Sequence, residues 1–368
     1  MFIWERQGWP SLRWDERRLL EPLAAARHRQ GLLLGHLRGQ GFAVGLDARL
    51  QAHTDEVVQS SAIEGDPLDP RAVRSSIARH LGIPDAGLVT VDRRTDGIVE
   101  MMLDATGHLD APLTRERLFG WQAALFPTGY AGRHPVRTGG WRDDAEGPMQ
   151  VVSGPIGRGR VHFRAPPASR VDSEMDRFLG WFDAEARPEG LLRAGLAHLW
   201  FVTVHPFDDG NGRLARAIAD RALAQSEGSV QRFYSMSSQI REERARYYEM
   251  LERTQRGGLD VTDWLQWFLG CFERALERSE VTLARVFAKA DFWRRFADEP
   301  LGERQRKVLN RLLDGFEGRI TAKKWAALGK VSIPTAQRDL NDLLARGLLA
   351  RSPGGSKNTS YTLAFGTP

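Results

Sequence analysis

Twelve consecutive residues, 205–216, constrain the fold of this 368-residue chain more than any other segment. They read His-Pro-Phe-Asp-Asp-Gly-Asn-Gly-Arg-Leu-Ala-Arg, and helix-forming stretches lie on both sides, at 194–204 and 214–223. We expect a tight loop between two helices, in which Gly-Asn-Gly opens the second helix. Unpaired N–H groups and the positive end of the helix dipole lie at such a start, so the loop is predicted to bind an anion.

The residue types in this run indicate a polyphosphate site with a base at its edge. Gly210 and Gly212 let the backbone approach a phosphate with no Cβ in the way. Arg213 and Arg216 are three residues apart, on one helical face, and can donate to phosphate oxygens. His205 is the one candidate base of the run with an ordinary pKa near neutrality, so we expect it to accept a proton without a large pKa shift.

The run matches, without a departure, the pattern His-x-Phe-x-Asp-Gly-Asn-Gly-Arg-x-x-Arg that defines the Fic family. The chain therefore resembles a Fic AMP-transferase, an enzyme that moves AMP from ATP onto a side-chain hydroxyl of a protein and releases pyrophosphate. An ordinary turn beside a structural histidine is the alternative, but long specific motifs rarely match by chance. Relatives of this fold that transfer the γ-phosphate depart from Gly-Asn-Gly-Arg, which is intact here.

The resemblance assigns a role to each motif residue. His205 is the catalytic base that takes the proton of the target hydroxyl. Asp209 is the oxygen ligand that holds Mg²⁺ through the α- and β-phosphates. The ATP-binding residues are Asp209, Gly210, Asn211, Gly212, Arg213 and Arg216, with Arg213 neutralising the charge of the leaving group. We expect Phe207 to pack inward and Asp208 to face solvent.

A second motif, Ser60-Ser61-Ala62-Ile63-Glu64-Gly65, matches the Fic inhibitory pattern Ser/Thr-x-x-x-Glu-Gly/Asn. The resemblance implies that Ser60, Glu64 and Gly65 form a built-in inhibitor. Glu64 would pair with Arg216 and compete with the γ-phosphate, so that ATP binds with its α-phosphorus out of line for attack. The alternative is that Glu64 merely decorates a solvated helix end.

The stretch 139–167 has few helix formers, and two short β-type runs, 149–153 and 160–164, predict a β-hairpin. In Fic proteins a flap hairpin ahead of the motif holds the target segment. Val151, Val152, Ser153 and Gly154 are therefore expected to align the target backbone. A Tyr247-Tyr248 pair after the motif stands where the family places two tyrosines beside the nucleotide base; plain core packing is the alternative.

The whole chain is predicted to be mainly α, with a Fic helical core, a β-hairpin flap, an N-terminal helical region and a C-terminal winged helix-turn-helix. The expected domains are a helical region with the inhibitory motif at 1–105, the catalytic core at 106–295 and a winged-helix-like domain at 300–368. Further helices are expected from about Asp15, from near Asp47, and over 70–80, 96–109, 114–125, 171–186, 191–204, 213–225, 241–256, 261–272, 304–316, 321–328 and 332–345.

The C-terminal segment is basic. Residues 301–368 carry twelve Lys and Arg against five Asp and Glu, whereas the whole chain has a formal net charge of +5. A winged helix would place Gln337 and Arg338 on its recognition helix and Lys357 on its wing. Asp339 and Asp342 share that helix and weaken the case for DNA, so DNA binding and protein docking or dimerisation both stay open.

Other features bound the function. A single cysteine, Cys271, excludes an internal disulfide and a cysteine-based metal site, and no apolar leader or membrane span is evident, so we expect a cytoplasmic protein without a membrane partner. The leading hypothesis is ATP- and Mg²⁺-dependent AMP transfer to a Ser, Thr or Tyr hydroxyl of an unknown protein, which could be the chain itself. The alternatives are removal of AMP from a modified protein and a nucleotide-sensing, DNA-binding regulator. A homodimer is a further open partner.

Overall fold

The structure is a computed structural model that describes residues 1–38, 42–83, 89–145, 147–153, 159–184, 188–314, 316, 318–352 and 359–364. It is mainly helical, as predicted. The chain divides into two compact units, one of residues 1–39 and 49–279 and the other of residues 40–48 and 280–368. Gly154 of the predicted flap and Lys357 of the predicted wing lie outside the described residues.

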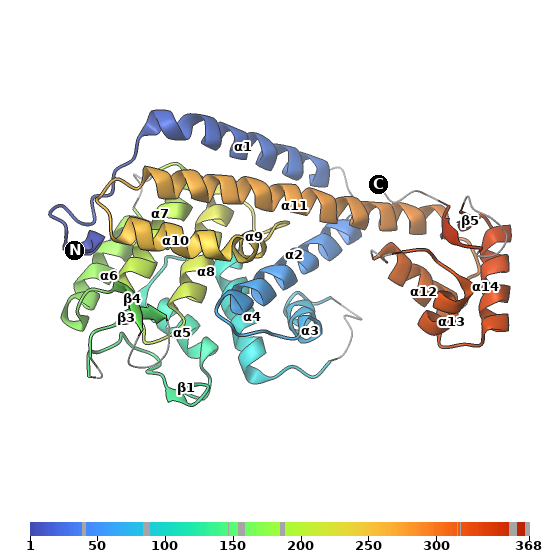
Figure 1. The fold of residues 1–368 in the computed structure, drawn as a ribbon, viewed down its shortest axis with the longest axis horizontal. Coiled ribbons are helices and arrows are strands. Elements are labelled where there is room, and N and C mark those ends of the chain that lie inside the picture. Colours follow the sequence, from blue (N-terminus) through green and yellow to red (C-terminus); the bar gives the residue numbers. More distant parts are fainter. Residues whose placement is uncertain are drawn as a thin grey trace. The chain divides into compact units, whose positions relative to one another are not determined.

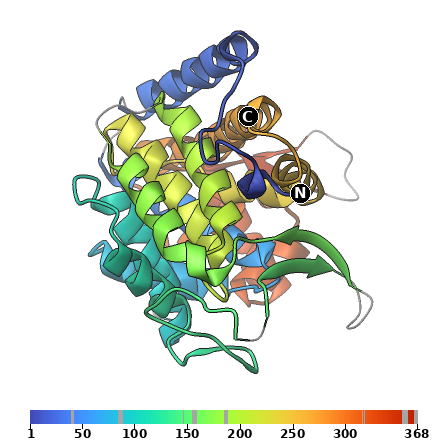
Figure 2. The ribbon, with the colours of Figure 1, turned by 90° about the vertical axis from the view of Figure 1, so that its left-hand side faces the viewer.

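Two helices joined by the predicted loop form the centre of the first unit. They are α7 (Gly190–Val204) and α8 (Asn211–Glu227), which pack along each other and lie in the middle of the unit in Figure 2. Around them the unit contains η1 (Ile3–Glu5), α1 (Glu16–Arg38), α3 (Pro70–His80), α4 (Arg93–Gly107), α5 (Arg115–Leu125), α6 (Ala168–Phe182), α9 (Met236–Glu242) and α10 (Arg244–Gln255). It also contains α2 (Phe42–Ile63) from residue 49 onward and α11 (Thr262–Arg295) up to residue 279. α1 lies along α11, where ion pairs join Arg18 to Asp263 and Arg29 to Glu277 (Figure 1).

The sequence explains why α7 and α8 are central. All residues of α7 from Leu191 to Val204 are buried, and a helix that is apolar on every side must lie inside a core. α7 ends where His205 turns into the left-handed region (φ 52°), and α8 begins after Gly210, which is also left-handed (φ 88°). The predicted helix–loop–helix at 205–216 is therefore confirmed.

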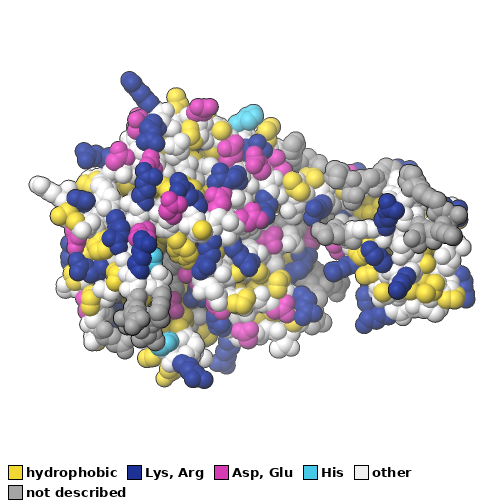
Figure 3. Space-filling model, in the orientation of Figure 1, with side chains coloured by type: hydrophobic (Ala, Val, Ile, Leu, Met, Phe, Trp, Pro, Cys, Tyr) yellow, Lys and Arg dark blue, Asp and Glu magenta, His cyan; other side chains and the backbone are white. Residues whose placement is uncertain are grey.

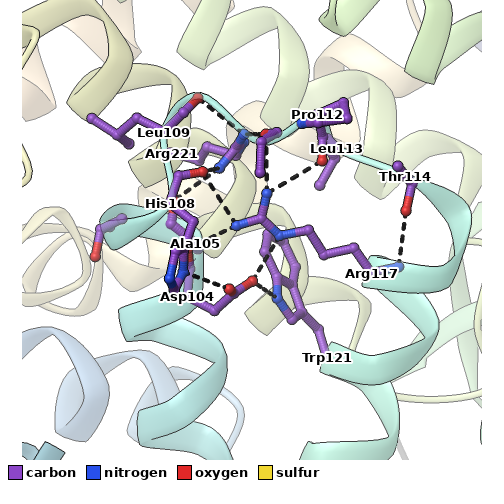
Figure 4. A network of polar contacts seen from close by, with 12 residues as sticks. Asp104, Ala105, His108, Leu109, Pro112, Leu113, Thr114, Arg117, Trp121 and Arg221 are labelled. Carbon is purple, nitrogen blue, oxygen red and sulfur yellow. Dashed lines mark hydrogen bonds and ion pairs between the residues drawn. The ribbon is translucent and has the colours of Figure 1, made fainter.

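A buried arginine ties α8 to the connection between α4 and α5 (Figure 4). Arg221 donates to the carbonyl oxygen of His108, directly after α4, at 2.8 Å, and to that of Ala111 in the connection to α5. Beside it, Arg117 and the indole of Trp121 both donate to one carboxylate, that of Asp104, at 2.7 Å. These bonds hold α8 in place two turns beyond Arg213.

Three small antiparallel hairpins complete the fold. The predicted flap is present as β3 (Gln150–Ser153) and β4 (Arg160–Arg164), with a bulge between Val151 and Val152. A shorter hairpin, β1 (Tyr130–Ala131) with β2 (His134–Pro135), was not predicted, because two-residue strands leave no alternating pattern in a sequence. The third hairpin, β5 (Leu349–Arg351) with β6 (Tyr361–Leu363), belongs to the second unit.

The second unit has its own core. α12 (Glu303–Leu313), α13 (Ala322–Gly329) and α14 (Ile333–Ala345) enclose Trp325, which is fully buried, together with Leu309, Leu340 and Leu343. Three helices followed by a two-stranded hairpin is the order of elements expected for residues 300–368. The relationship to winged helices stays a prediction.

Some boundaries differ from those expected. α2 begins at Phe42 instead of near Asp47, and a single helix expected over 241–256 is divided into α9 and α10 at Glu243. The helix expected over 261–272 continues to Arg295, because the charged residues that follow Phe272 are themselves good helix formers. Both sides of the expected boundary at 105/106 lie in the first compact unit, and the division into domains stays a prediction.

None of the helices within the described ranges combines the length and the apolar composition that a bilayer-spanning segment needs.

The close packing of α4 on α5 predicts a difference between two glycines. A Cβ built on Gly97 of α4 would lie 2.2 Å from the carbonyl oxygen of Ala124, whereas a Cβ on Gly120 of α5 would meet no atom within 4 Å. Gly97→Ala should therefore lower the free energy of unfolding by about 1–3 kcal/mol, measured by denaturant unfolding. Gly120→Ala, the matched control, should raise it by about 0.5–1 kcal/mol, because alanine is the better helix former. Equal effects of the two changes would contradict the packing.

Candidate active site

The loop between α7 and α8 is closed by its own asparagine. The Asn211 side chain accepts a hydrogen bond from the Phe207 N–H at 3.0 Å and donates to the Phe207 carbonyl at 2.7 Å. Phe207 is fully buried against Trp141, and Asp208 is exposed, as expected for both. Asn211 thus positions the loop with its side-chain oxygen and one side-chain N–H, which leaves the second N–H of its amide as a donor for a ligand. The predicted contact of Asn211 with phosphate stays a prediction.

A second buried arginine, which the sequence analysis missed, supports the start of the loop. The backbone N–H of Arg142 donates to the carbonyl oxygen of Pro206 at 3.0 Å, and its Nε donates to that of His205 at 2.7 Å. The same guanidinium reaches the carbonyl of Pro166 and the carboxylate of Asp144. A lone arginine in a glycine-rich stretch gives no sequence signal of this role, since the role depends on contacts across 63 residues.

The ring of His205 is held in one orientation. Its Nδ1 lies 3.2 Å from the carbonyl oxygen of Val202. A carbonyl only accepts, so Nδ1 carries the proton and Nε2 keeps its lone pair. Burial lowers the pKa of His205 to about 4, although the nearby Val202 carbonyl raises it in part. The expectation of an unshifted pKa is therefore wrong: the imidazole is neutral at pH 7 and available as a base, with a weaker basicity than a free histidine.

The residues of the predicted inhibitory motif, at the end of α2, contact α8. Glu64 Oε1 is 2.8 Å from Arg216 Nη1, and Ser60 accepts from Arg216 twice, at its hydroxyl and its carbonyl oxygen, both at 2.9 Å. Arg216 is only 2% exposed. The predicted pairing of Glu64 with Arg216 is thus present in the structure.

The carboxylate of Glu64 also occupies the predicted anion position. A Cβ built on Gly212 would lie 2.2 Å from Glu64 Oε1, so this oxygen rests directly on the first turn of α8. No residue other than glycine could stand at 212 with the carboxylate in this place. The absence of a side chain at Gly212 allows an anionic oxygen to approach the helix start, as the sequence predicts.

A cavity of about 910 Å³ brings the predicted site residues together. His205, Gly212 and Glu64 form one part of its wall, and Tyr247 and Tyr248 of α10 form another. Tyr247 is buried and hydrogen-bonded to His198 Nε2 at 2.9 Å, whereas Tyr248 is 37% exposed. The flap contributes Val151, Val152 and Ser153 to the cavity wall, all three exposed along β3. Ser60, Asn211, Arg213 and Arg216 are buried beside the cavity.

The flap is bonded to α10 through a polar cluster that the sequence analysis did not identify. His162 Nδ1 lies 2.7 Å from Glu252 Oε2, and His162 Nε2 lies 2.6 Å from the hydroxyl of Ser153. Arg160 and Arg256 also pair with Glu252, and the side-chain hydrogen bond with His162 opposes burial and keeps the pKa of Glu252 below its usual range. This cluster fixes the distance between the flap and the helix that carries the tyrosines.

Asp209 is the residue that could hold a metal ion. Its side chain is 48% exposed, and its Oδ1 lies 3.9 Å from Arg213 Nη2. In the part of the chain that the structure describes, no three His, Cys, Asp or Glu side chains are grouped as metal ligands. A single exposed carboxylate fits Mg²⁺, which commonly takes one or two protein carboxylates and completes its shell with substrate phosphates and water.

Two families match parts of the chain. Residues 112–223 match the Fic/DOC family, and residues 2–83 match a domain of unknown function, DUF4172. The first match contains the whole 205–216 motif, and the second contains residues 60–65, the predicted inhibitory motif.

Among curated proteins, protein adenylyltransferase Fic of Culex quinquefasciatus is 30% identical over 105 residues, which cover 28% of this chain and 19% of that protein. A uridine 5'-monophosphate transferase of Xanthomonas campestris pv. campestris is 31% identical over 121 residues, 31% of this chain and 21% of that protein. Protein adenylyltransferase Fic of Nematostella vectensis is 24% identical over 236 residues, 62% of this chain and 48% of that protein. The chain thus spans between a fifth and a half of the length of these relatives.

Among solved structures, a Fic family protein from Desulfovibrio desulfuricans G20 superposes with a TM-score of 0.55 at 19% identity, over 94% of this chain and 95% of that one. A Fic domain containing signalling protein from Bacteroides thetaiotaomicron has a TM-score of 0.50 at 17% identity, over 73% and 95% of the two chains. At these identities the likeness shows a shared fold.

Because His205 is buried, we expect its ring to take up a proton only at low pH. In an NMR titration, the His205 ring should change protonation with a midpoint near pH 4, well below the ordinary value of 6.5. The His205→Ala variant identifies the signal. Because the unfolded chain binds this proton at a higher pH than the folded protein, protonation of His205 should also destabilise the fold as the pH falls from about 6.5 towards 4. A midpoint near 6.5 would mean that the ring is solvated and that the described loop geometry is wrong.

Proposed function

We propose that the chain transfers AMP from ATP to a Ser, Thr or Tyr hydroxyl of a protein and releases pyrophosphate, because residues 112–223 match the Fic/DOC family. One observation carries this proposal. A neutral histidine, with its Nε2 lone pair unused by the loop, shares one cavity with the glycine-opened start of α8, and the buried Arg213 and Arg216 follow on that helix. This combination provides a base and an anion site for a polyphosphate.

The proposed step is a displacement at the α-phosphorus. The hydroxyl oxygen of the target attacks this phosphorus, and its proton passes to Nε2 of His205. The bond from the α-phosphorus to the oxygen bridging to the β-phosphate breaks, and pyrophosphate leaves. The N–H groups at the start of α8 and the guanidinium of Arg213 stabilise the charge that collects on the leaving group. Mg²⁺ at Asp209 would neutralise the phosphates and fix their geometry.

In the described state the site is proposed to be inhibited. Glu64 pairs with Arg216 and fills the space above Gly212, so a γ-phosphate cannot reach either of them. Removal of the carboxylate would let the triphosphate shift by the small distance that brings the α-phosphorus into line with the hydroxyl. Rates depend steeply on this alignment, since a misplacement of about 1 Å can cost on the order of 10²-fold.

The nucleotide donor and the direction of the reaction each have an alternative. Two of the relatives above are named adenylyltransferases and one a uridine 5'-monophosphate transferase, so ATP is proposed as the donor and UTP is the comparison to test. Glu64 also lies close enough to His205 to raise its pKa in part, which would suit the positioning of a water for the removal of AMP.

The test of the proposed function is transfer of labelled AMP by the Glu64→Gly variant. Incubation with labelled ATP, Mg²⁺ and a cell lysate should label proteins at least tenfold more strongly than the wild type does, because alignment of the α-phosphorus is restored. Adding His205→Ala should abolish labelling while ATP affinity stays within a few-fold.

The control is Glu249→Gln, compared with Glu64→Gln. Glu249 also contributes a carboxylate to the cavity wall, but it pairs with Arg246 and not with Arg216. The Glu249→Gln variant should label proteins at the wild-type level. If Glu64→Gly leaves transfer unchanged but slows the release of AMP from a modified protein, removal of AMP replaces transfer as the function. Stronger labelling from UTP than from ATP would change the donor.

We further propose that the second unit binds duplex DNA, because the structure removes the objection from Asp339 and Asp342. Arg304 donates to both carboxylate oxygens of Asp339, at 2.8 and 2.9 Å, and these bonds lower the pKa of Asp339. Asp342 accepts from Gln305 and from Arg346. Both acidic groups are thus satisfied within the unit.

The remaining surface of α14 suits a nucleic acid. Arg338 and Asn341 are exposed, and Gln337 lies beside them, bonded to Asn341 and to the hydroxyl of Tyr361. These are the side-chain types that read guanine and adenine edges. Lys and Arg groups spread over this unit in Figure 3, and its exposed basic residues include Arg319, Lys323, Lys324, Lys330 and Arg351.

DNA binding by the full chain should fall steeply with salt, because phosphate contacts release counterions. Arg338→Ala should weaken binding of a mixed-sequence duplex and reduce the slope of log K against log salt by about 1. Arg294→Ala removes a basic group that pairs with Asp291 on α11 and should change neither quantity. Absence of binding even at about 50 mM salt would favour a docking or dimerisation role for the unit.

A further inference from the structure

The end of α2 carries a second carboxylate to the site. After Glu64 the chain turns at Gly65, which adopts a left-handed conformation (φ 79°), and the N–H of Asp66 donates back to the carbonyl of Ser61 at 3.1 Å. This turn is a common way to end a helix. Through it, Glu64 and Asp66 both reach α8: Glu64 pairs with Arg216, and Asp66 Oδ2 lies 3.2 Å from Arg213 Nη1.

One oxygen of Asp66 is shared between two arginines. Asp66 Oδ2 contacts Arg213, which is part of the motif, and also forms an ion pair with Nη2 of Arg94, near the start of α4. Two guanidinium groups that meet at a single anionic oxygen form a binding position for any oxyanion of similar charge. Arg94 is about half exposed and lies outside both motifs found in the sequence.

Arg213 has unused capacity for an anion. Its side chain is 5% exposed, and its Nε has no hydrogen-bond partner among the described residues. Its guanidinium lies 5.2 Å from the centre of the Phe126 ring, and burial lowers its pKa. A buried guanidinium with a free N–H requires a stronger anionic partner than one carboxylate oxygen at 3.2 Å.

We propose that Asp66 Oδ2 marks the position of a nucleotide phosphate oxygen, and that Arg94 is a third phosphate-binding arginine that Asp66 blocks together with Arg213. This inference rests on the proposed function in that the ligand is the triphosphate of a nucleotide. Glu64 and Asp66 then occupy two neighbouring phosphate positions at once, with the left-handed Gly65 between them. Removal of Glu64 alone frees Arg216 but leaves Arg213 and Arg94 neutralised.

The test is the affinity for ATP with Mg²⁺, measured by calorimetry on the full chain without any target protein. Asp66→Asn should bind ATP about threefold to tenfold more tightly than the wild type, because both arginines lose their competing charge. Glu100→Gln removes an exposed carboxylate elsewhere on α4 and should leave the affinity unchanged. Asp66→Ala serves as a second variant with the same expected direction.

Arg94 is tested in the Asp66→Asn background, where its charge can act only on the ligand. There, Arg94→Gln should lower ATP affinity about threefold to tenfold, whereas Arg93→Gln, which removes the neighbouring exposed charge of α4, should lower it by less than twofold. If Asp66 instead orients Arg213 for the phosphate, Asp66→Asn will weaken binding, and the inference is overturned. It is also overturned if Arg94→Gln and Arg93→Gln behave alike.

The inference and the proposed function can fail separately. Tighter ATP binding by Asp66→Asn, without labelling of any protein by Glu64→Gly, supports the phosphate position and contradicts AMP transfer. Labelling by Glu64→Gly with an unchanged affinity of Asp66→Asn supports transfer and contradicts the inference. No ATP binding by any variant contradicts both.

Discussion

The ion pair between Glu64 and Arg216 is the interaction on which the rest of the site depends. Arg216 is only 2% exposed, and breaking such a buried ion pair by removing one member is costly. An anion near the first turns of α8 is therefore strongly favoured. In the described state the protein supplies it from α2, and in the proposed active state the nucleotide supplies it. In this proposal, the inhibitory carboxylate and the substrate phosphate both supply the negative charge that Arg216 pairs with.

Contacts elsewhere in the first unit hold α8 and the loop before it in a fixed position. α7 and α8 are buried along most of their length, and Arg221 and Arg142 bond the far end of α8 and the start of the loop to neighbouring backbone carbonyls. Asn211 closes the loop from inside. These bonds do not involve Glu64 or Asp66, the two carboxylates that the turn at Gly65 places at the end of α2. In the proposed mechanism the loop therefore stays in place while these two side chains give way to the nucleotide.

Local sequence predicted those features that depend on neighbours along the chain. The loop at 205–216 and the flap hairpin follow from motifs and periodicity, and the structure contains both. The pairing of Glu64 with Arg216 joins residues 152 apart, and it was expected only from the resemblance to a family. Features that depend on tertiary contacts could not be predicted. The lowered pKa of His205 arises from burial, and the roles of Arg142 and Arg94 arise from partners in distant segments. Asp339 is a further example. From the sequence, its charge is expected to repel DNA, whereas in the fold this charge is paired with Arg304.

We propose that the carboxylates at the end of α2 stand where nucleotide phosphates bind. A crystal structure of the Glu64→Gly variant with Mg²⁺ and a non-hydrolysable ATP analogue tests this proposal most directly. We expect phosphate oxygens within hydrogen-bond distance of Arg216 and above Gly212, and the α-phosphorus exposed to a hydroxyl that His205 Nε2 can reach. A triphosphate bound elsewhere in the cavity, with Arg216 still paired only to Ser60, would contradict it.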